Sequence, residues 1–160
     1  MSDPDAHLDA LIRHVGLVRD ACILLGKRLI ARGRPDFGRL LIARGVVHDA
    51  SKFYGIEWEY LQTGEDVPEH LRKPAIDHHR HTNDHHPAYW GGFENMPEIS
   101  VAEMACDLFA RSQEFGTDLR QWIRETAVPR YRIDPTGEQL RWLEGFVEML
   151  LSKPFEPRTG

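Results

Sequence analysis

The 160-residue sequence lacks the features that mark membrane, secreted and nucleic-acid-binding proteins. It has only two cysteines, Cys22 and Cys106, which are too few for a disulfide framework and are not spaced as a zinc knuckle. No run of about 18 apolar residues is present, and the acidic N-terminus lacks the apolar segment of a signal peptide. The formal net charge is −5, without a basic run interleaved with aromatic residues, which argues against nucleic acid or an anionic membrane as the main partner. We therefore expect a cytoplasmic protein.

Alternating runs of β-branched residues are also missing, so we expect an all-α fold. The chain has no internal repeat, low-complexity tract or flexible linker, and residues 1–160 are therefore expected to form one compact domain. The spacing of apolar residues, together with residues typical of helix starts and ends, predicts about six to seven helices. Their expected ranges are 4–32 (after a Ser2-Asp3-Pro4-Asp5 start signal with Ser2 as the cap), 36–52, 55–64, 66–82, 98–115, 118–127 and 135–152, with a loop over 83–97.

Two of these helices carry polar side chains on their apolar faces. His14 is spaced three and four residues from apolar neighbours, and a core histidine bonded to a backbone carbonyl is its simplest interpretation. His48 falls on the buried face of the second helix, and Asp49 follows it. Asp49 could cap the helix end or pair with Lys52. A buried imidazole beside a buried carboxylate is costly, however, unless a cation such as a divalent metal offsets the desolvation.

Six of the nine histidines lie between His70 and His86. His78 and His81 are three residues apart and share a helical face, whereas His85 and His86 follow in the predicted loop. Such a run can be a solvated tract of little consequence. Here it is followed by the sequence PAYW, which indicates a structured loop and favours a functional role.

The predicted helix over 98–115 is apolar nearly all round except for one polar strip. The strip carries Glu103, Asp107, Arg111 and Glu114. On periodicity alone such a strip is the water-facing side of a helix, so Asp107 is the weakest candidate for a buried site.

Four further side chains have open roles. Tyr89 and Trp90 could stack on a base, form a lid or fill a gap in the core. Glu57 and Glu59 are typical solvated helix residues, although either could reach a site near the end of the second helix.

Taken in order, these elements resemble the HD superfamily of metal-dependent phosphohydrolases over about residues 8–115. The segment His-Asp-Ala-Ser-Lys at 48–52 is similar to the HD-x-small-Lys segment of that superfamily. HDASKF, followed by HHRHTNDHHPAYW and EMACD, looks most like a small HD-like family of bacterial and phage proteins. The resemblance implies a compact HD-like domain, with the helices over 117–152 added C-terminally.

The resemblance also implies a ligand set. The residues that match the first metal of the superfamily are His14, His48, Asp49 and Asp107, which reverses the periodicity argument for Asp107. The candidates for a second metal are His79 and His85 or His86, with Asp49 as the bridge. The cofactor would be one or two divalent ions (Mn, Fe, Co, Ni, Zn or Mg). Lys52 would hold a phosphate oxygen, Asp49 would act at the metal, and an unligated histidine such as His79 would protonate the leaving oxygen.

The implied function is hydrolysis of a small phosphorylated molecule, such as a nucleotide, by metal-activated water. No glycine-rich phosphate cradle is present, so phosphate binding would fall to the metal and Lys52. A di-iron oxygenase of HD-type architecture, a non-catalytic metal- or ligand-binding HD-like domain, and a helical interaction protein with incidental histidines are the alternatives. The leucine-rich segment over 138–151 suits a homodimer interface and a core equally well.

Overall fold

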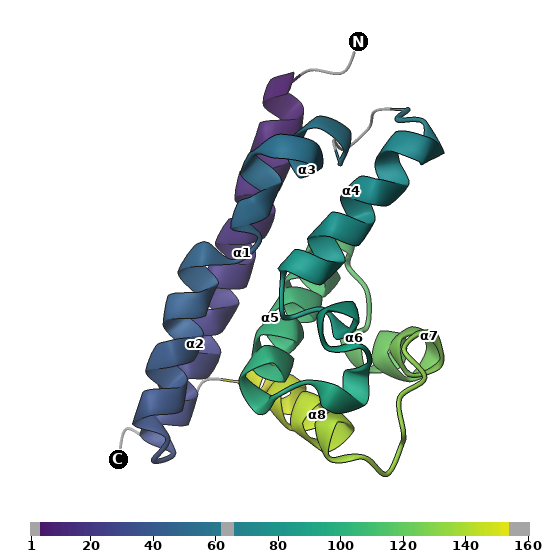
Figure 1. Cartoon of the computed structure of the whole chain (residues 1–160). Coiled ribbons are helices and arrows are strands. Elements are labelled where there is room, and N and C mark those ends of the chain that lie inside the picture. Colours follow the sequence, from purple (N-terminus) through teal and green to yellow (C-terminus); the bar gives the residue numbers. More distant parts are fainter. Residues whose placement is uncertain (1–3, 62–65, 154–160) are drawn as a thin grey trace.

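A long helical hairpin forms one side of the molecule (Figure 1). The computed structural model describes residues 4–61 and 66–153, and the hairpin consists of α1 (Pro4–Ala31) and α2 (Pro35–Val47). The chain reverses at Gly33, whose φ of 86° suits a residue without a Cβ, and Pro35 begins α2. The predicted cap residue Ser2 and the adjoining Asp3 lie outside the described residues.

Glycines bring the two helices of this hairpin into backbone contact. A Cβ added to Gly38 would lie 2.4 Å from the carbonyl oxygen of Gly26, and one added to Gly45 would lie 2.5 Å from Cβ of Cys22. These separations are shorter than van der Waals contact, so larger residues would push α2 away from α1. The contact keeps the end of α2 close to α1, and the ring centroids of His14 and His48 are 5.8 Å apart.

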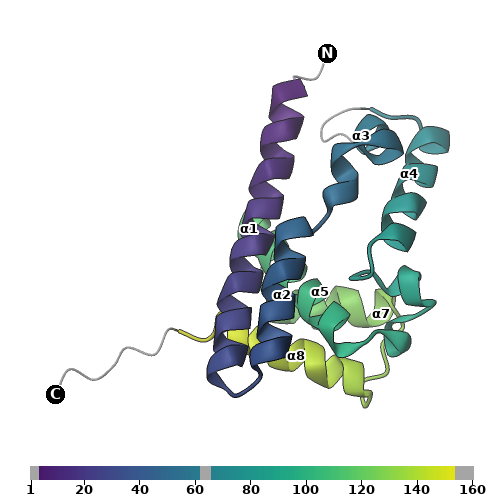
Figure 2. The ribbon, with the colours of Figure 1, turned by 60° about the vertical axis from the view of Figure 1, so that its left-hand side comes forward.

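α5 (Glu98–Phe115) is the central helix of the fold. It packs against α1, α2 and α8 (Glu138–Leu151), and α8 crosses the base of the hairpin (Figure 2). Residues 100–106 of α5 are all buried, which is typical of a helix inside a core. Val18, Leu25 and Leu41 of the hairpin are fully buried in the same core.

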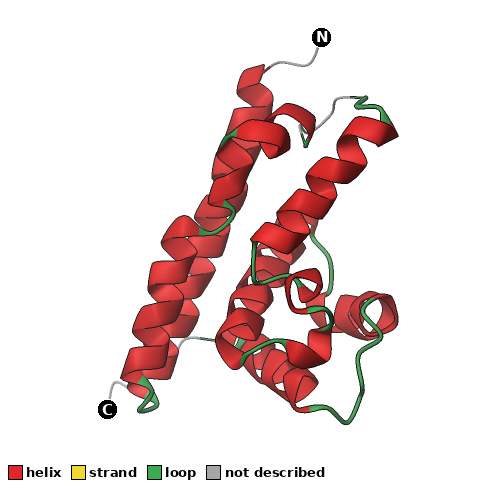
Figure 3. Ribbon diagram, viewed as in Figure 1, coloured by secondary structure: helices red, strands yellow, loops and turns green. Residues whose placement is uncertain are grey.

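The remaining elements are the 14-residue α4 and a set of shorter segments, four of which are brief 3-10 or π-helical turns with the prefix η. They are η1 (Ala50–Phe53), α3 (Gly55–Tyr60), α4 (Glu69–Thr82), η2 (Pro87–Trp90), η3 (Phe93–Asn95), α6 (Leu119–Trp122), the π-helical turn η4 (Ile123–Ala127) and α7 (Val128–Arg130). No strand occurs in residues 4–61 or 66–153 (Figure 3), and the expected all-α class is therefore confirmed. None of the helices within these ranges is long and apolar enough to cross a membrane.

Several helix ends differ from the prediction. The predicted helix over 98–115 coincides with α5, whereas α4 begins at Glu69 after a Pro68 cap and α8 begins only at Glu138. The predicted helix over 118–127 is interrupted by the π-helical turn and continues to Arg130. Residues 62–64 of the predicted third helix lie outside the described residues.

The inward face of α2 is narrower than its apolar residues suggested. Leu41 is fully buried as expected, but Leu40 and Val47 are exposed. Gly38, Leu41 and Gly45 are the buried residues of α2, and Leu40 lies about 100° around the helix from Leu41. The apolar residues of the predicted helix over 36–52, which include Leu40 and Val47, would be expected to point inward, and for these two that expectation is wrong.

Candidate metal centre

The turn after α2 determines where the first predicted ligands point. α2 ends at Val47, so the prediction that it continues to Lys52 is wrong. His48 leaves the helix with φ −54° and ψ 131°, and Asp49 adopts the left-handed conformation with φ 54° and ψ 24°. Aspartate is one of the few non-glycine residues that tolerate this conformation. The turn buries both side chains, leaving His48 3% and Asp49 1% exposed.

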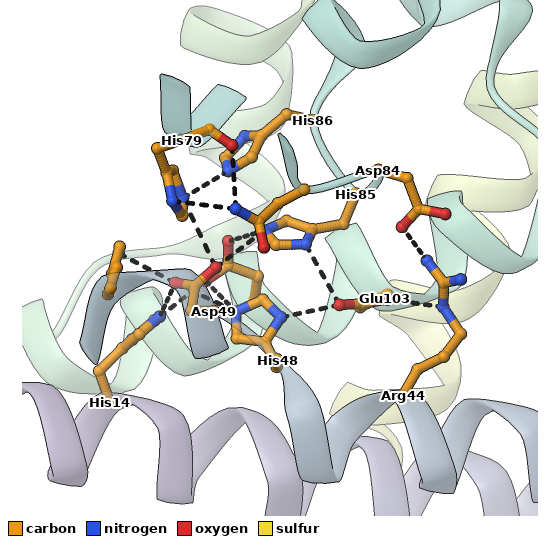
Figure 4. Close-up of polar contacts among 12 residues, drawn as sticks. His14, Arg44, His48, Asp49, His79, Asp84, His85, His86 and Glu103 are labelled. Carbon is orange, nitrogen blue, oxygen red and sulfur yellow. Dashed lines mark hydrogen bonds and ion pairs between the residues drawn. The ribbon is translucent and has the colours of Figure 1, made fainter. Parts of the chain in front are cut away.

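All seven predicted metal ligands meet around Asp49. They come from α1, the turn after α2, α4, the loop that follows α4, and α5, as Figure 4 shows for most of them. The seven residues are His14, His48, Asp49, His79, His85, His86 and Asp107. Residues that are as many as 93 positions apart in the sequence are therefore brought to one place by the packing of α1, α2, α4 and α5.

One oxygen of Asp49 faces the first group of ligands. Oδ2 lies 3.7 Å from Nε2 of His14 and 3.5 Å from Nε2 of His48. Asp107 of α5 joins this group, with Oδ1 3.1 Å from Nε2 of His14 and 3.7 Å from Nε2 of His48. This arrangement of two imidazoles and two carboxylates agrees with the first predicted ligand set.

The other oxygen of Asp49 faces the second group. Oδ1 lies 3.5 Å from Nε2 of His79 and 3.3 Å from Nε2 of His85. Nε2 of His86 lies 2.9 Å from Nε2 of His79. Two ring nitrogens at this distance require a proton or a cation between their lone pairs. The sequence left open whether His85 or His86 belongs to the cluster, and both do.

Three buried or half-buried glutamates orient the histidines from outside the cluster. Glu114 lies 2.8 Å from Nδ1 of His14, and Glu57 lies 2.6 Å from Nδ1 of His79. An ionised carboxylate can only accept hydrogen bonds, so each Nδ1 donates and each Nε2 presents a lone pair to the centre. A carboxylate behind a histidine is the usual outer partner of a metal-ligating imidazole.

Glu103 accepts hydrogen bonds from two histidines at once. Its Oε1 accepts from Nδ1 of His48 at 2.9 Å and from Nδ1 of His85 at 3.2 Å. Its Oε2 accepts from Nε of Arg44 at 2.6 Å, and the same guanidinium bonds Asp84 (Figure 4). Glu103 therefore connects both groups of ligands to a partly buried ion-pair network.

Five buried polar atoms of the cluster have no hydrogen-bond partner among the described residues. They are Nε2 of His14, His48 and His85, and Oδ1 of Asp49 and Asp107. Leaving one buried polar atom unsatisfied costs about 1–3 kcal/mol, and here all five face the same small volume. Imidazole nitrogen and carboxylate oxygen are standard ligands of divalent metals, and a cation in this volume would satisfy them together. The residues present thus fit a bound metal ion.

The protonation states show what a bound metal ion would displace. Burial opposes ionisation of Asp49, but His48, His85 and Lys52 together outweigh burial, and the pKa of Asp49 lies well below its ordinary range. Burial, with the neighbouring His85, lowers the pKa of His86 to about 3, so its imidazole is neutral at physiological pH. Burial also lowers the pKa values of His48 and His85, but the surrounding carboxylates outweigh it and raise both. Because neutral imidazole and ionised carboxylate bind metal, Asp49 and His86 are in the binding form, whereas a metal ion would displace protons from His48 and His85.

The cluster opens onto a cavity of about 570 Å³, a size usual for small-molecule sites. His14, Asp49, His79, His86 and Asp107 are the members of the cluster that line it. Lys52, the predicted phosphate contact, lines the same cavity, and its Nζ lies 2.9 Å from Oδ2 of Asp49. A ligand in this cavity can therefore reach the cluster and Lys52 together.

Other candidates lie outside the cluster. His81 is exposed and bonds a backbone carbonyl of its own helix, while His78 bonds the outer carboxylate Glu57. Trp90 packs against the core and donates from Nε1 to a loop carbonyl, so it fills a core gap. Neither Trp90 nor the exposed Tyr89 is among the described residues that line the cavity.

The sequence did not identify Glu103 and Glu114 as part of the site. Both belong to the polar strip of α5 and face the cluster, and Glu103 is only 5% exposed. Glu57 is 1% exposed and lies 2.6 Å from Nδ1 of His79, so of its two open interpretations the one in which it reaches the site holds. Glu59 is exposed as expected. The position of Glu103 one turn before Asp107 was the available signal.

Comparison with known proteins assigns the chain to a family. No curated protein and no solved structure matches it. The model of one family, described as a family of unknown function (DUF5662), matches residues 3–149, which include every residue of the candidate metal centre. The chain therefore belongs to the DUF5662 family.

Proposed function

We propose that the protein is a metal-dependent phosphohydrolase that acts on a small phosphorylated molecule. The observation that carries the proposal is the convergence of five buried ligand atoms, without a hydrogen-bond partner among the described residues, beside a cavity that His14, Asp49 and Asp107 line. Outer carboxylates that fix each imidazole tautomer support a metal in that position. The resemblance of the His14, His48–Asp49 and Asp107 pattern to the HD superfamily supports the same chemistry.

Asp49 supports a centre with two cation positions. Its two oxygens face different sets of histidines, so one carboxylate can bridge two ions. Two-metal hydrolytic centres commonly place their ions about 3.5–4 Å apart, a spacing that a bridging carboxylate can span. His14, His48 and Asp107 would complete one position, and His79, His85 and His86 the other.

A bound divalent cation supplies a nucleophilic hydroxide near neutral pH and offsets phosphate charge. Side chains of the protein bind the substrate and position the proton. Lys52 holds a phosphate oxygen through Nζ, as a point charge beside Asp49. Glu57 keeps the proton of His79 on Nδ1, which leaves Nε2 facing the cavity. Where His79 is not a ligand, the lone pair of its Nε2 would first accept the proton that the attacking water loses, and the same nitrogen would then donate that proton to the leaving oxygen.

The test is the metal content of tag-free protein by elemental analysis, followed by a phosphatase screen with manganese, iron, cobalt, nickel, zinc and magnesium. We expect about one or two equivalents in the wild type, lost in Asp49→Asn and kept in His81→Gln, a histidine outside the cluster. Metal that follows His81 instead of Asp49 would overturn the proposal. Iron with dioxygen consumption and without phosphatase activity would favour an HD-type oxygenase, and bound metal without turnover would favour a binding domain.

A further inference from the structure

Positively charged side chains are concentrated around the cavity beside the metal centre, although the net charge of the chain is −5. Four positively charged side chains line it, one each from α1, η1, α4 and α5. They are Arg13, Lys52, Arg80 and Arg111. The carboxylates in the same lining are Asp49, Asp107 and Glu114, so the lining is positive even before a divalent cation binds. A lining of this kind favours an anionic ligand.

Two of these cations already serve the metal centre. Lys52 pairs with Asp49, and Arg111 donates to Glu114 at 2.9 Å, the carboxylate that orients His14. Together with a divalent cation, Lys52 can accommodate the phosphate group that is hydrolysed. These contacts leave the other two cations without a role in the reaction.

Arg13 and Arg80 are the two cations that remain. Neither forms an ion pair or a hydrogen bond within the part of the chain that the structure describes, 4–61 and 66–153. The carboxylate of Asp77 is paired with Lys73 at 3.0 Å. Lys73, with a smaller contribution from Arg80, lowers the pKa of Asp77. Both guanidinium groups are therefore available to a ligand that extends outward from the metal centre.

The cavity is large enough for such an extended ligand. Its volume of about 570 Å³ exceeds what a single inorganic phosphate needs and falls within the usual range for small organic molecules. Apolar side chains of Leu11, Leu61, Ile76 and Phe115 also line it, and these can contact the organic part of the ligand. The lining thus offers a metal centre, an apolar surface and two guanidinium groups that no residue of 4–61 or 66–153 engages.

We propose, building on the proposed phosphohydrolase function, that the substrate is a small organic phosphate ester with a second phosphoryl group, which Arg13 and Arg80 bind. A guanidinium group presents a planar fork of donors that matches phosphate oxygens in pairs. Two such forks offer more donors than one carboxylate can accept, whereas a phosphoryl group has three terminal oxygens and up to two charges. The second group is held and not hydrolysed, so its removal from the substrate weakens binding but not the chemical step.

The test compares two esters that differ only in the second group, adenosine 5′-monophosphate and adenosine 3′,5′-bisphosphate. We measure kcat and KM for metal-loaded wild type and for the double variant Arg13→Gln/Arg80→Gln. The double variant should raise KM for the bisphosphate about 10-fold per arginine while leaving kcat and the monophosphate unchanged. The control is Arg19→Gln/Arg72→Gln, which removes two exposed arginines from the same helices, neither of which lines the cavity.

A second measurement separates this inference from the proposed function. Calorimetric binding of adenosine 3′,5′-bisphosphate to EDTA-treated protein needs neither metal nor turnover. Wild-type binding that the Arg13→Gln/Arg80→Gln variant loses supports the subsite even if no ester is hydrolysed, in which case the proposed function is the part that fails. Hydrolysis with equal KM for both esters, or equal effects of the test and control variants, would overturn the subsite and leave the phosphohydrolase proposal standing.

Discussion

Replacement of Glu103 by glutamine is expected to weaken cation binding on both sides of Asp49. Oε1 of Glu103 accepts from His48 in one ligand group and from His85 in the other. An amide cannot replace the carboxylate, because Oε2 also accepts from Nε of Arg44. With its oxygen toward the histidines, glutamine turns its NH₂ group toward Arg44, and in the other orientation NH₂ meets two imidazole N–H groups. Two donors face each other in either case.

The size of the effect follows from the number of ligands that lose their partner. Removal of the outer partner of one ligand lowers metal affinity about 10- to 100-fold. We expect a loss of this size, about 1.4–2.7 kcal/mol, for each of the two cation positions in Glu103→Gln. The folded protein should lose a further amount of about 1–3 kcal/mol in unfolding free energy, because a buried donor is left unsatisfied.

The assay is calorimetric titration of metal-stripped protein with Mn²⁺ or Zn²⁺. Glu114→Gln and Glu57→Gln are the matched variants, since Glu114 orients only His14 and Glu57 orients only His79 within the cluster. Each of these should weaken one binding step, whereas Glu103→Gln should weaken both. If Glu103→Gln titrates like the wild type, or affects a single step as Glu114→Gln does, then the shared carboxylate does not couple the two positions and the reasoning is wrong.

Three further predictions concern the cation, the hairpin and pH. Lys52→Met should lower kcat/KM for a phosphate ester about 10- to 100-fold in a steady-state assay. Its metal affinity should stay equal or rise, because the ammonium group of Lys52 competes with metal for Asp49 in the wild type, and a parallel loss of metal would contradict this. Gly38→Ala should lower the unfolding free energy by about 1–3 kcal/mol in urea titrations, whereas Gly16→Ala, with nothing within 4 Å of its added Cβ, should be neutral or stabilising. His86 has a pKa of about 3 when folded against 6.5 when unfolded, so the unfolded chain binds more protons between these values and the fold loses stability as pH falls. Metal-free wild type should therefore lose about 1–2 kcal/mol relative to His86→Gln between about pH 7 and 5, and parallel stability curves for the two proteins would refute this.

Local patterns sufficed to predict most of the helices. The apolar periodicity of 98–115 coincides with α5, because a long buried helix has a strong pattern and clear ends. The end of α2 was missed, because the sequence from Val46 to Lys52 contains no proline or glycine to stop a helix. There the chain turns at an aspartate in the left-handed conformation, which contacts between distant segments hold in place.

The candidate site shows the same limit. Single histidines on apolar faces were recognisable, and His14 and His48 are buried as expected. The polar strip on α5 was ambiguous, because a charged row on an apolar helix can face either water or a polar centre. Only the packing of α5 against α1 and α2 decides that Glu103 and Asp107 face the cluster.

The left-handed turn at Asp49 combines a strained backbone with a carboxylate that stabilises the fold. A residue with a Cβ adopts this conformation at a cost of about 1 kcal/mol, and glycine adopts it freely. Glycine would, however, remove a carboxylate that His48, His85 and Lys52 keep ionised, and the lowered pKa means that this carboxylate stabilises the folded chain at neutral pH. A library screened only for thermal tolerance of metal-free protein should therefore retain aspartate at this position, although the turn by itself favours glycine. The bridge between the two halves of the centre would then persist without any selection for cation binding.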